Sequence, residues 1–341
     1  MTNYSFLEAL PAGFFDLQVE NILSLFREPT LIYLQGQKSP PLFVSILLHG
    51  NEYSGLKAVQ ALLRQYNDVL PRSMYLYIGN VTAAAQGLRV IPGQTDYNRC
   101  WPGTEMAPND ETRLMQSVVE RVTREPLFAA IDVHNNSGFN PHYAGITSIT
   151  EENRYIAAMF NHIGMAFRRP RGVSTMAFDN ICPAATLECG RPGEPVGIQH
   201  ATELLDAMLH MDHFPEKPLP PRDLQLLQTV ATVKVPDQVS IVFDLNGDAD
   251  LVFQADLDRL NFNEIKPNQA IARTRVDEPL TIISQSGEDI TTEIIRVEGG
   301  NVFLNRTLIP AMITLNETIV RQDCLCHLME DFCLDKFPQD I

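Results

Sequence analysis

A histidine and a glutamate stand where an apolar segment of the sequence ends. The segment PLFVSILL (41–48) has the character of a buried strand, and His49 and then Glu52 follow it. Side chains spaced in this way can turn toward one point above the edge of a sheet. An imidazole nitrogen and a carboxylate oxygen both bind Zn²⁺, which in catalytic sites takes three protein ligands and leaves one position for water. Taken alone, the pair is more often a polar cap on a strand.

A third ligand follows a second apolar segment. Residues 127–133 (LFAAIDV) are predicted to form a strand, and His134 stands at its end, as His49 does in the first motif. Asp132 lies two residues earlier, on the same face of that strand, where its carboxylate could orient an imidazole. The repeated placement favours a metal site over a histidine in a surface loop. His49, Glu52 and His134 are therefore the candidate ligands of one zinc ion.

Glu188 ends a third predicted strand, ATLEC (185–189). A glutamate before a glycine could be a solvated turn residue. Beside zinc, however, it is placed to act as a general base, because the metal lowers the pKa of bound water from ~15.7 toward ~7. The same carboxylate could then pass the proton to the leaving nitrogen.

A loop rich in glycine and proline, GLRVIPGQTDYNRCWPG (87–103), carries Arg89, Asn98 and Arg99. The guanidinium of Arg99 offers the paired donors that a substrate carboxylate fits, and Asn98 adds another donor. Arg89 could face the scissile carbonyl and stabilise the oxyanion. The competing interpretation is that these arginines pair with Asp96 or Glu105.

The elements that must position these residues alternate between strands and helices up to about residue 214. The predicted strands are 42–48, 73–80, 127–133 and 185–189, and the predicted helices are 55–70, 109–125 (with Asn109 as N-cap), 151–166 and 197–211. This alternation is typical of an α/β sheet with helices on both faces. Ligands of open α/β sheets bind at the carboxyl ends of the strands, where the three motifs fall.

The segment 214–223 contains four prolines and is the best candidate for a linker. Beyond it the sequence consists of short segments rich in β-branched residues, separated by turn signals, with a short helix predicted over 326–334. We therefore expect a catalytic domain over 1–213, a Pro-rich linker over 214–223 and a smaller β-rich domain over 224–341.

The overall composition is that of an ordinary globular protein, with 45% hydrophobic and 20% charged residues among 341. The sequence has no apolar stretch long enough for a membrane helix and no basic N-terminal signal region, so we expect a cytoplasmic protein. A net charge of −16 disfavours nucleic acid and anionic membranes as partners. The six cysteines are predicted to be free thiols.

As a set and in this order, the motifs resemble the zinc carboxypeptidase-like hydrolases, and in particular the succinylglutamate desuccinylase/aspartoacylase family. The motifs are H-G-N-E (49–52), D-Y-N-R-x-W-P-G (96–103), D-V-H (132–134) and L-E-C-G (187–190). The resemblance implies a mixed sheet with helices on both faces and a β-rich C-terminal domain. It also implies that His49, Glu52 and His134 bind one zinc ion, that Asn98 and Arg99 bind the carboxylate of an amino acid, that Arg89 polarises the amide, and that Glu188 is the catalytic carboxylate.

The sequence departs from the family pattern in two places. Ile91-Pro92-Gly93 is an apparent insertion before the N-R motif, and the loop after His134 reads NNSGFNPHY. Specificity for the acyl group is expected to lie in such loops. The candidates in the second loop are Asn135, Asn136, His142 and Tyr143, with ordinary loop polarity as the alternative.

The leading functional hypothesis is a zinc hydrolase that cleaves an amide bond next to a free carboxylate, as an N-acyl amino acid deacylase does. The same site would serve a metallocarboxypeptidase acting on short peptides. From a different class, the chain could be a catalytically inactive binding protein, which the complete set of motifs argues against. The acyl group, the amino acid and the oligomeric state stay open, with a homo-oligomer as one option.

Overall fold

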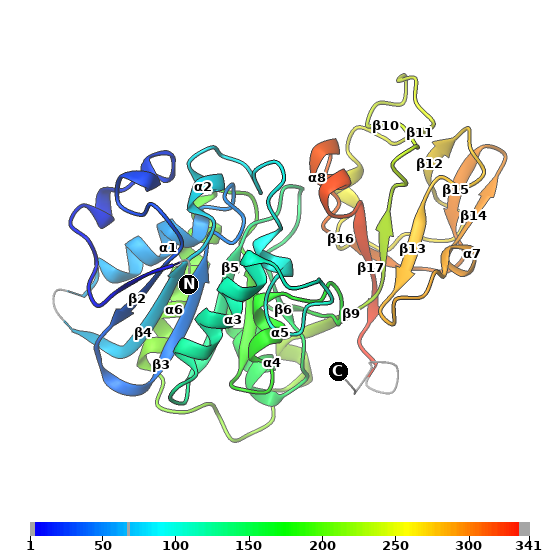
Figure 1. The fold of residues 1–341 in the computed structure, drawn as a ribbon. Helices are drawn as coiled ribbons and strands as arrows, with labels where there is room; N and C mark the ends of the chain where they lie inside the picture. Colours follow the sequence, from blue (N-terminus) through cyan, green and yellow to red (C-terminus); the bar gives the residue numbers. More distant parts are fainter. Residues whose placement is uncertain (1–3, 67–68, 334–341) are drawn as a thin grey trace. The chain divides into compact units, whose positions relative to one another are not determined.

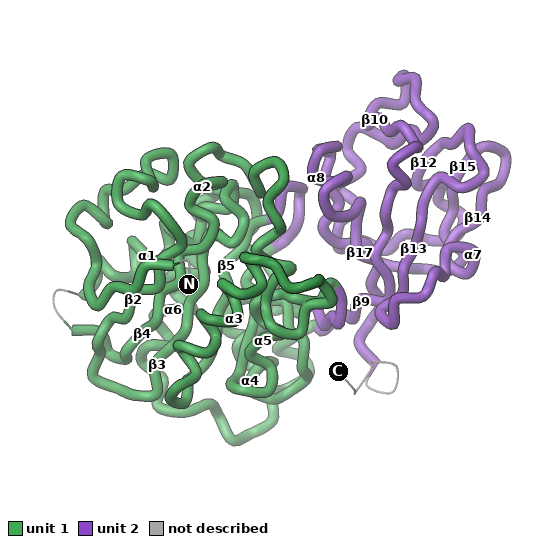
Figure 2. The backbone as a smooth tube through the Cα atoms, viewed as in Figure 1, with its two compact units in different colours: residues 1–135, 142–164, 170–225 green, residues 136–141, 165–169, 226–341 purple. Residues whose placement is uncertain are grey.

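The chain folds into two compact units (Figure 2). The computed structural model describes residues 4–66 and 69–333. Among these, the segments up to 135, 142–164 and 170–225 form unit 1. The segments 136–141, 165–169 and from 226 onward form unit 2. The Pro-rich segment 214–223 falls near the end of unit 1, and the division into domains 1–213 and 224–341 stays a prediction.

Unit 1 is built on a mixed sheet (Figure 1). Its strands, in spatial order, are β1 (Ser5–Leu7), β2 (Thr30–Leu34), β4 (Leu70–Ile78), β3 (Gly36–Ile46), β5 (Ala129–His134), β8 (Ala184–Glu188) and β6 (Tyr143–Ile146). The central strands β4, β3, β5 and β8 are parallel, and β6 is antiparallel to β8. The carboxyl ends of β3, β5 and β8 therefore lie at one edge, which carries all three motifs of the sequence.

Helices cover both faces of this sheet, as predicted. They are α1 (Ser54–Leu63), α2 (Val81–Ala84), α3 (Asp110–Val122), α4 (Glu151–Phe160), α5 (Ser174–Phe178) and α6 (Pro195–His210). Phe43 and Tyr77 share a core with the apolar stripe of α3 and with Phe178 of α5. Ile46 and Val133 point to the opposite face, where α1 approaches so closely that only a glycine fits at position 55.

Short 3₁₀ segments complete unit 1. They are η1 (Phe14–Asp16), η2 (Val19–Ser24), η3 (Tyr97–Arg99) and η4 (Pro221–Asp223). The predicted cap of α3 is confirmed, since the Asn109 side chain accepts from Thr112 N–H while the Thr112 hydroxyl meets Asn109 N–H. This exchange is a capping box.

Two predicted helices are shorter in the structure. The helix predicted over 55–70 ends at Leu63, because Leu70 opens β4 and pairs with Gly36 of β3. The helix predicted over 151–166 ends at Phe160, and β7 (Ile163–Ala166) follows. In both cases a short apolar run fitted the helical period as well as the strand period, and pairing with other strands of the sheet decided between them.

Unit 2 is rich in short strands, as predicted. Its elements are β9 (Gln225–Lys234), β10 (Ile241–Val242), β11 (Leu251–Val252), η5 (Leu257–Leu260), β12 (Ala270–Thr274), β13 (Thr281–Ser284), α7 (Thr291–Ile294), β14 (Ile295–Glu298), β15 (Asn301–Leu304), β16 (Ile309–Ala311), α8 (Glu317–Gln322) and β17 (Cys326–Asp331). They form the strand orders β13-β9-β17-β16 and β10-β11-β12-β15-β14. The helix predicted at 326–334 is wrong, since residues 326–331 pair with β9 and β16 as β17.

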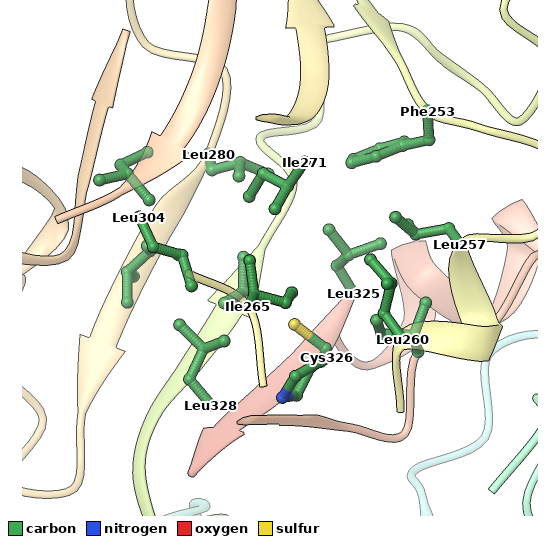
Figure 3. A pocket seen from close by; sticks show the side chains of 15 residues that line it. Phe253, Leu257, Leu260, Ile265, Ile271, Leu280, Leu304, Leu325, Cys326 and Leu328 are labelled. Carbon is green, nitrogen blue, oxygen red and sulfur yellow. The ribbon is translucent and has the colours of Figure 1, made fainter. Parts of the chain in front are cut away.

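A cavity of about 30 Å³ lies in the core of unit 2 (Figure 3). Its walls are apolar side chains, among them Phe253, Leu280 and Leu328. A space of this size holds at most one water molecule, and an apolar lining offers that water no partners. We interpret this cavity as a gap in packing rather than a binding site.

The cysteines and the lengths of the helices bear on two expectations from the composition. All six cysteines are free, and five of them are buried. None of the helices in the described part of the chain has the length and apolar character needed to cross a membrane.

Candidate metal centre and active site

Three side chains at the carboxyl edge of the sheet could together hold a metal ion. His49 and Glu52 follow β3, and His134 is the last residue of β5. One ligand atom from each of the three lies within 4.8 Å of the others, and all three residues are buried. The residues that the sequence placed at two separate strand ends are thus brought to one point.

The rings are oriented as metal ligation requires. Nδ1 of His49 lies 2.8 Å from one oxygen of Glu52, and Nδ1 of His134 lies 2.7 Å from the other. Nε2 of His49 lies 3.0 Å from Asp96, and Nε2 of His134 lies 2.7 Å from Asp132. A carboxylate beyond each ring can accept a hydrogen bond from Nε2–H and so leave the Nδ1 lone pair for a cation, which is the usual arrangement around metal-bound histidines. The donor set therefore fits a divalent metal.

Local backbone features turn the chain at this edge. Leu47, directly after β3, has φ of 57°, a left-handed conformation that non-glycine residues adopt at some energetic cost. A Cβ on Gly50 would lie 2.2 Å from Ala84 N, so only glycine lets the chain between His49 and Glu52 pass this close to α2. This close contact explains Gly50 more directly than the freedom of a tight turn does.

Charges at the centre favour a cation. Burial alone would raise the pKa of Glu52, but His49 and His134 hold that pKa well below its usual range. Burial alone would lower the pKa of His134, but the carboxylates of Asp132 and Glu52 raise it well above its usual value. The carboxylates thus stabilise positive charge on the imidazoles between them. A divalent ion bound at the same place could supply that positive charge in place of the imidazole protons.

Asp96 connects the centre to the loop 87–103, which carries Asn98 and Arg99 and is called the N-R loop below. Its Oδ1 lies 3.0 Å from His49 Nε2 and accepts from Asn98 N–H at 2.7 Å, while its Oδ2 accepts from Arg89 at 3.2 Å. Burial raises the pKa of Asp96, but His49, Arg89 and Arg99 outweigh it and hold that pKa well below its usual range. This role of Asp96 beside His49 was not predicted from the sequence, where Asp96 was only a possible partner for an arginine. Its position two residues before Asn98 was the available signal.

We expect Asp96→Asn to weaken the affinity of this group for a divalent metal about 10- to 100-fold, because an amide orients the His49 ring less well than a carboxylate does. The dissociation constant can be measured by competition with a chromogenic chelator. Asp16→Asn, at a carboxylate that is 93% exposed, is the matched control and should change nothing. An unchanged affinity in Asp96→Asn would show that this carboxylate does not support the metal.

Glu188 ends β8 next to His134. The two residues are direct partners in the parallel register of β5 and β8, and Glu188 is buried. Burial is the largest influence on this carboxyl, and Glu52 adds to it; together they outweigh the opposing effect of the histidines and raise the pKa of Glu188 to about 7. A carboxyl with a pKa in this range can both take and return a proton near neutral pH.

Arg89 pairs with the carboxylates at the centre. Its guanidinium lies 3.4 Å from Glu52 and 3.2 Å from Asp96, and its side chain is 10% exposed. The alternative that Arg89 pairs with Asp96 therefore describes this structure. The assignment of Arg89 to a substrate carbonyl stays a prediction.

Asn98 and Arg99 lie in η3, close to the centre. Asn98 Nδ2 is 3.3 Å from His134 Nε2, and its Oδ1 accepts from Ser174 N–H at 3.0 Å. Trp101, which is fully buried against Phe43 and Tyr77, anchors the loop just after them. The loop is thus held to the domain core rather than exposed as a surface turn.

The fold and this centre define a class: an α/β protein with a His-Glu-His group that could hold a metal ion at the carboxyl edge of a mixed sheet. Residues 39–165 match the family model "Succinylglutamate desuccinylase/Aspartoacylase catalytic domain". The matched residues include His49, Glu52 and His134, and the match is to the same family that the sequence motifs resemble. Glu188 lies beyond the matched residues.

Solved structures with the same fold cover most of the chain. The succinylglutamate desuccinylase/aspartoacylase of Rhodobacter sphaeroides is 14% identical with a TM-score of 0.60, over 89% of this chain and 90% of its own. The succinylglutamate desuccinylase of Chromobacterium violaceum is 15% identical with a TM-score of 0.55, over 88% and 86%. Murine aminoacylase 3 is 14% identical with a TM-score of 0.53, over 87% and 96%. No curated protein sequence matches the chain.

Proposed function

We propose that this protein is a zinc-dependent hydrolase that cleaves an amide bond next to a free carboxylate, and that it acts as an N-acyl amino acid deacylase. One observation carries the proposal: the register of β5 and β8 sets Glu188 directly beside His134 of the His49–Glu52–His134 group. The family match of residues 39–165 supports the reaction class. The names desuccinylase and aminoacylase, borne by proteins with this fold, support the deacylase in particular.

His49, Glu52 and His134 would hold the ion, and Zn²⁺ would supply Lewis acidity that brings the pKa of a water from ~15.7 toward ~7. Glu188 takes a proton from the attacking water as its oxygen bonds to the acyl carbon. It then delivers that proton to the nitrogen as the C–N bond breaks. The products are a carboxylic acid and a free amino acid.

The N-R loop binds the rest of the substrate in this proposal. Arg99 and Asn98 hold the free carboxylate of the amino acid, and Arg89 faces the carbonyl oxygen as negative charge develops on it. Arg89 meets Glu52 and Asp96 in this structure, so in this role it would turn part of its guanidinium toward the substrate.

Arg99→Ala should raise KM about 10- to 100-fold with a smaller effect on kcat, because charge-assisted hydrogen bonds contribute about 1.5–3 kcal/mol. Steady-state kinetics on an N-acyl amino acid measure this change. Arg113→Ala, on the exposed face of α3, is the matched control. An unchanged KM in Arg99→Ala would exclude Arg99 from carboxylate binding.

The pH dependence of kcat/KM follows from Glu188. The base is active only as the carboxylate, so the rate should fall as the pH drops below the pKa of Glu188. Burial raises that pKa from 4.5 to about 7, and a bound cation opposes the shift. We therefore expect an acid limb with an apparent pKa between 4.5 and about 7 for the zinc enzyme. A flat profile down to pH of about 4.5 would contradict a titrating base at Glu188.

A metallocarboxypeptidase acting on short peptides would use the same groups. A panel of N-acetyl amino acids, N-succinyl amino acids and dipeptides separates the two, since a deacylase should prefer the small acyl groups by kcat/KM. Preference for dipeptides would favour the peptidase. A cytoplasmic location and a small-molecule substrate, rather than nucleic acid or membrane, remain part of this proposal.

A further inference from the structure

The residue after His134 connects all three strand-end motifs. Asn135 is buried, and its backbone N–H donates to Glu52 Oε2 at 3.0 Å. Its side-chain oxygen accepts from Ser54 N–H at 3.1 Å, and its side-chain nitrogen donates to Ser54 Oγ and to Gly190 O, both at 3.0 Å. We infer that Asn135 is a positioning residue that sets Glu188 against the metal centre, an inference that rests on the proposed function.

The first link fixes the segment that carries Glu52. Ser54 is the first residue of α1, and the N-cap residue Tyr53 makes no side-chain bond to the first-turn amides of this helix. Asn135 caps one of them from a distant part of the chain, so the start of α1, two residues after Glu52, is tied to the end of β5.

The second link fixes the turn that carries Glu188. Gly190 has φ of 69°, and its carbonyl accepts from Asn135, while Cys189 N–H donates to His134 O at 3.0 Å. Ser54 Oγ also accepts from Gly193 N–H at 3.1 Å. The loop that leaves Glu188 is thus held at both Gly190 and Gly193 by the pair Asn135 and Ser54.

These bonds also revise the earlier role suggested for Asn135. Both hydrogens of its amide nitrogen are already used within unit 1, so the side chain has no donor left for an acyl group. An amide is required at this position, because it must accept from Ser54 N–H and donate to Gly190 O at once. A carboxylate of the same shape could not donate and would repel the carbonyl.

The test is Asn135→Asp in the zinc-loaded enzyme, alone and combined with Glu188→Gln. We expect the single variant to keep one zinc per chain and a KM within about threefold, while kcat falls about 10- to 100-fold because the base is displaced. In the Glu188→Gln background the same substitution should cause no further loss, since groups that act as a unit are not additive. Losses that multiply, or a raised KM with unchanged kcat, would overturn the inference.

Ser54→Ala provides a second variant that keeps the backbone bond to Asn135 and removes only the hydroxyl. It should lower kcat in the same direction and by less, again with no effect in the Glu188→Gln background. If Asn135→Asp does not fold, normal kcat in Ser54→Ala overturns the inference. Full activity in Glu188→Gln itself would instead refute the proposed function, so the two failures are distinguishable.

Discussion

Glu188→Gln is expected to lower kcat at least about 100-fold while the protein keeps its zinc. The substitution preserves the size of the side chain and removes the carboxylate that takes the proton of the attacking water in the proposed reaction. Glu188 is not among the three residues of the metal-binding group, so metal affinity should change little. KM should also change little, because the N-R loop is untouched.

Kinetics and metal content must be measured on the same preparation of this variant. Glu203→Gln, at an exposed glutamate of α6, is the matched control and should retain normal kcat. Near-normal turnover in Glu188→Gln would remove this residue from the mechanism.

Glu52→Ala should abolish zinc binding and activity together. The carboxylate of Glu52 meets both imidazoles, Arg89 and the N–H of Asn135. Loss of a neighbouring carboxylate that orients a ligand typically weakens metal affinity by about 10- to 100-fold, so loss of a ligand should weaken it by more than about 100-fold. Two imidazoles alone do not supply the three ligands of a catalytic zinc site.

Thermal unfolding separates this effect from a general loss of structure. Zinc at about 100 times its Kd should stabilise the wild-type protein by about 2.7 kcal/mol and raise its Tm, and it should leave the Tm of Glu52→Ala unchanged. Zinc stabilisation that persists in Glu52→Ala would place the metal elsewhere.

Much of the fold and candidate site of unit 1 could be predicted from the sequence because each motif follows a strand. The apolar runs before His49, His134 and Glu188 identify three strands, and parallel strands bring their carboxyl ends to one edge. The mixed α/β fold and the His49–Glu52–His134 group follow from that pattern. The β-rich C-terminal part follows instead from the short β-branched segments and turn signals beyond residue 223.

The supporting network could not be predicted in the same way. The hydrogen bonds of Asp96 and Asn135 join segments that are tens of residues apart in the sequence. Some of these bonds involve backbone N–H and C=O groups, which every residue type carries, so the sequence gives no sign of them. The ends of two helices were predicted wrongly for a related reason. At Leu70 and at 163–166 the apolar residues fit both a helical and a strand period, and only the pairing of strands decides between them.

The decisive measurement for the proposed function combines zinc content with hydrolysis on one preparation of the protein. We expect one zinc per purified chain, hydrolysis of at least one N-acyl amino acid, loss of that activity on removal of zinc by a chelator, and its return when zinc is restored. Protein that holds no zinc, and that hydrolyses no N-acyl amino acid after zinc is added, would contradict the proposed function.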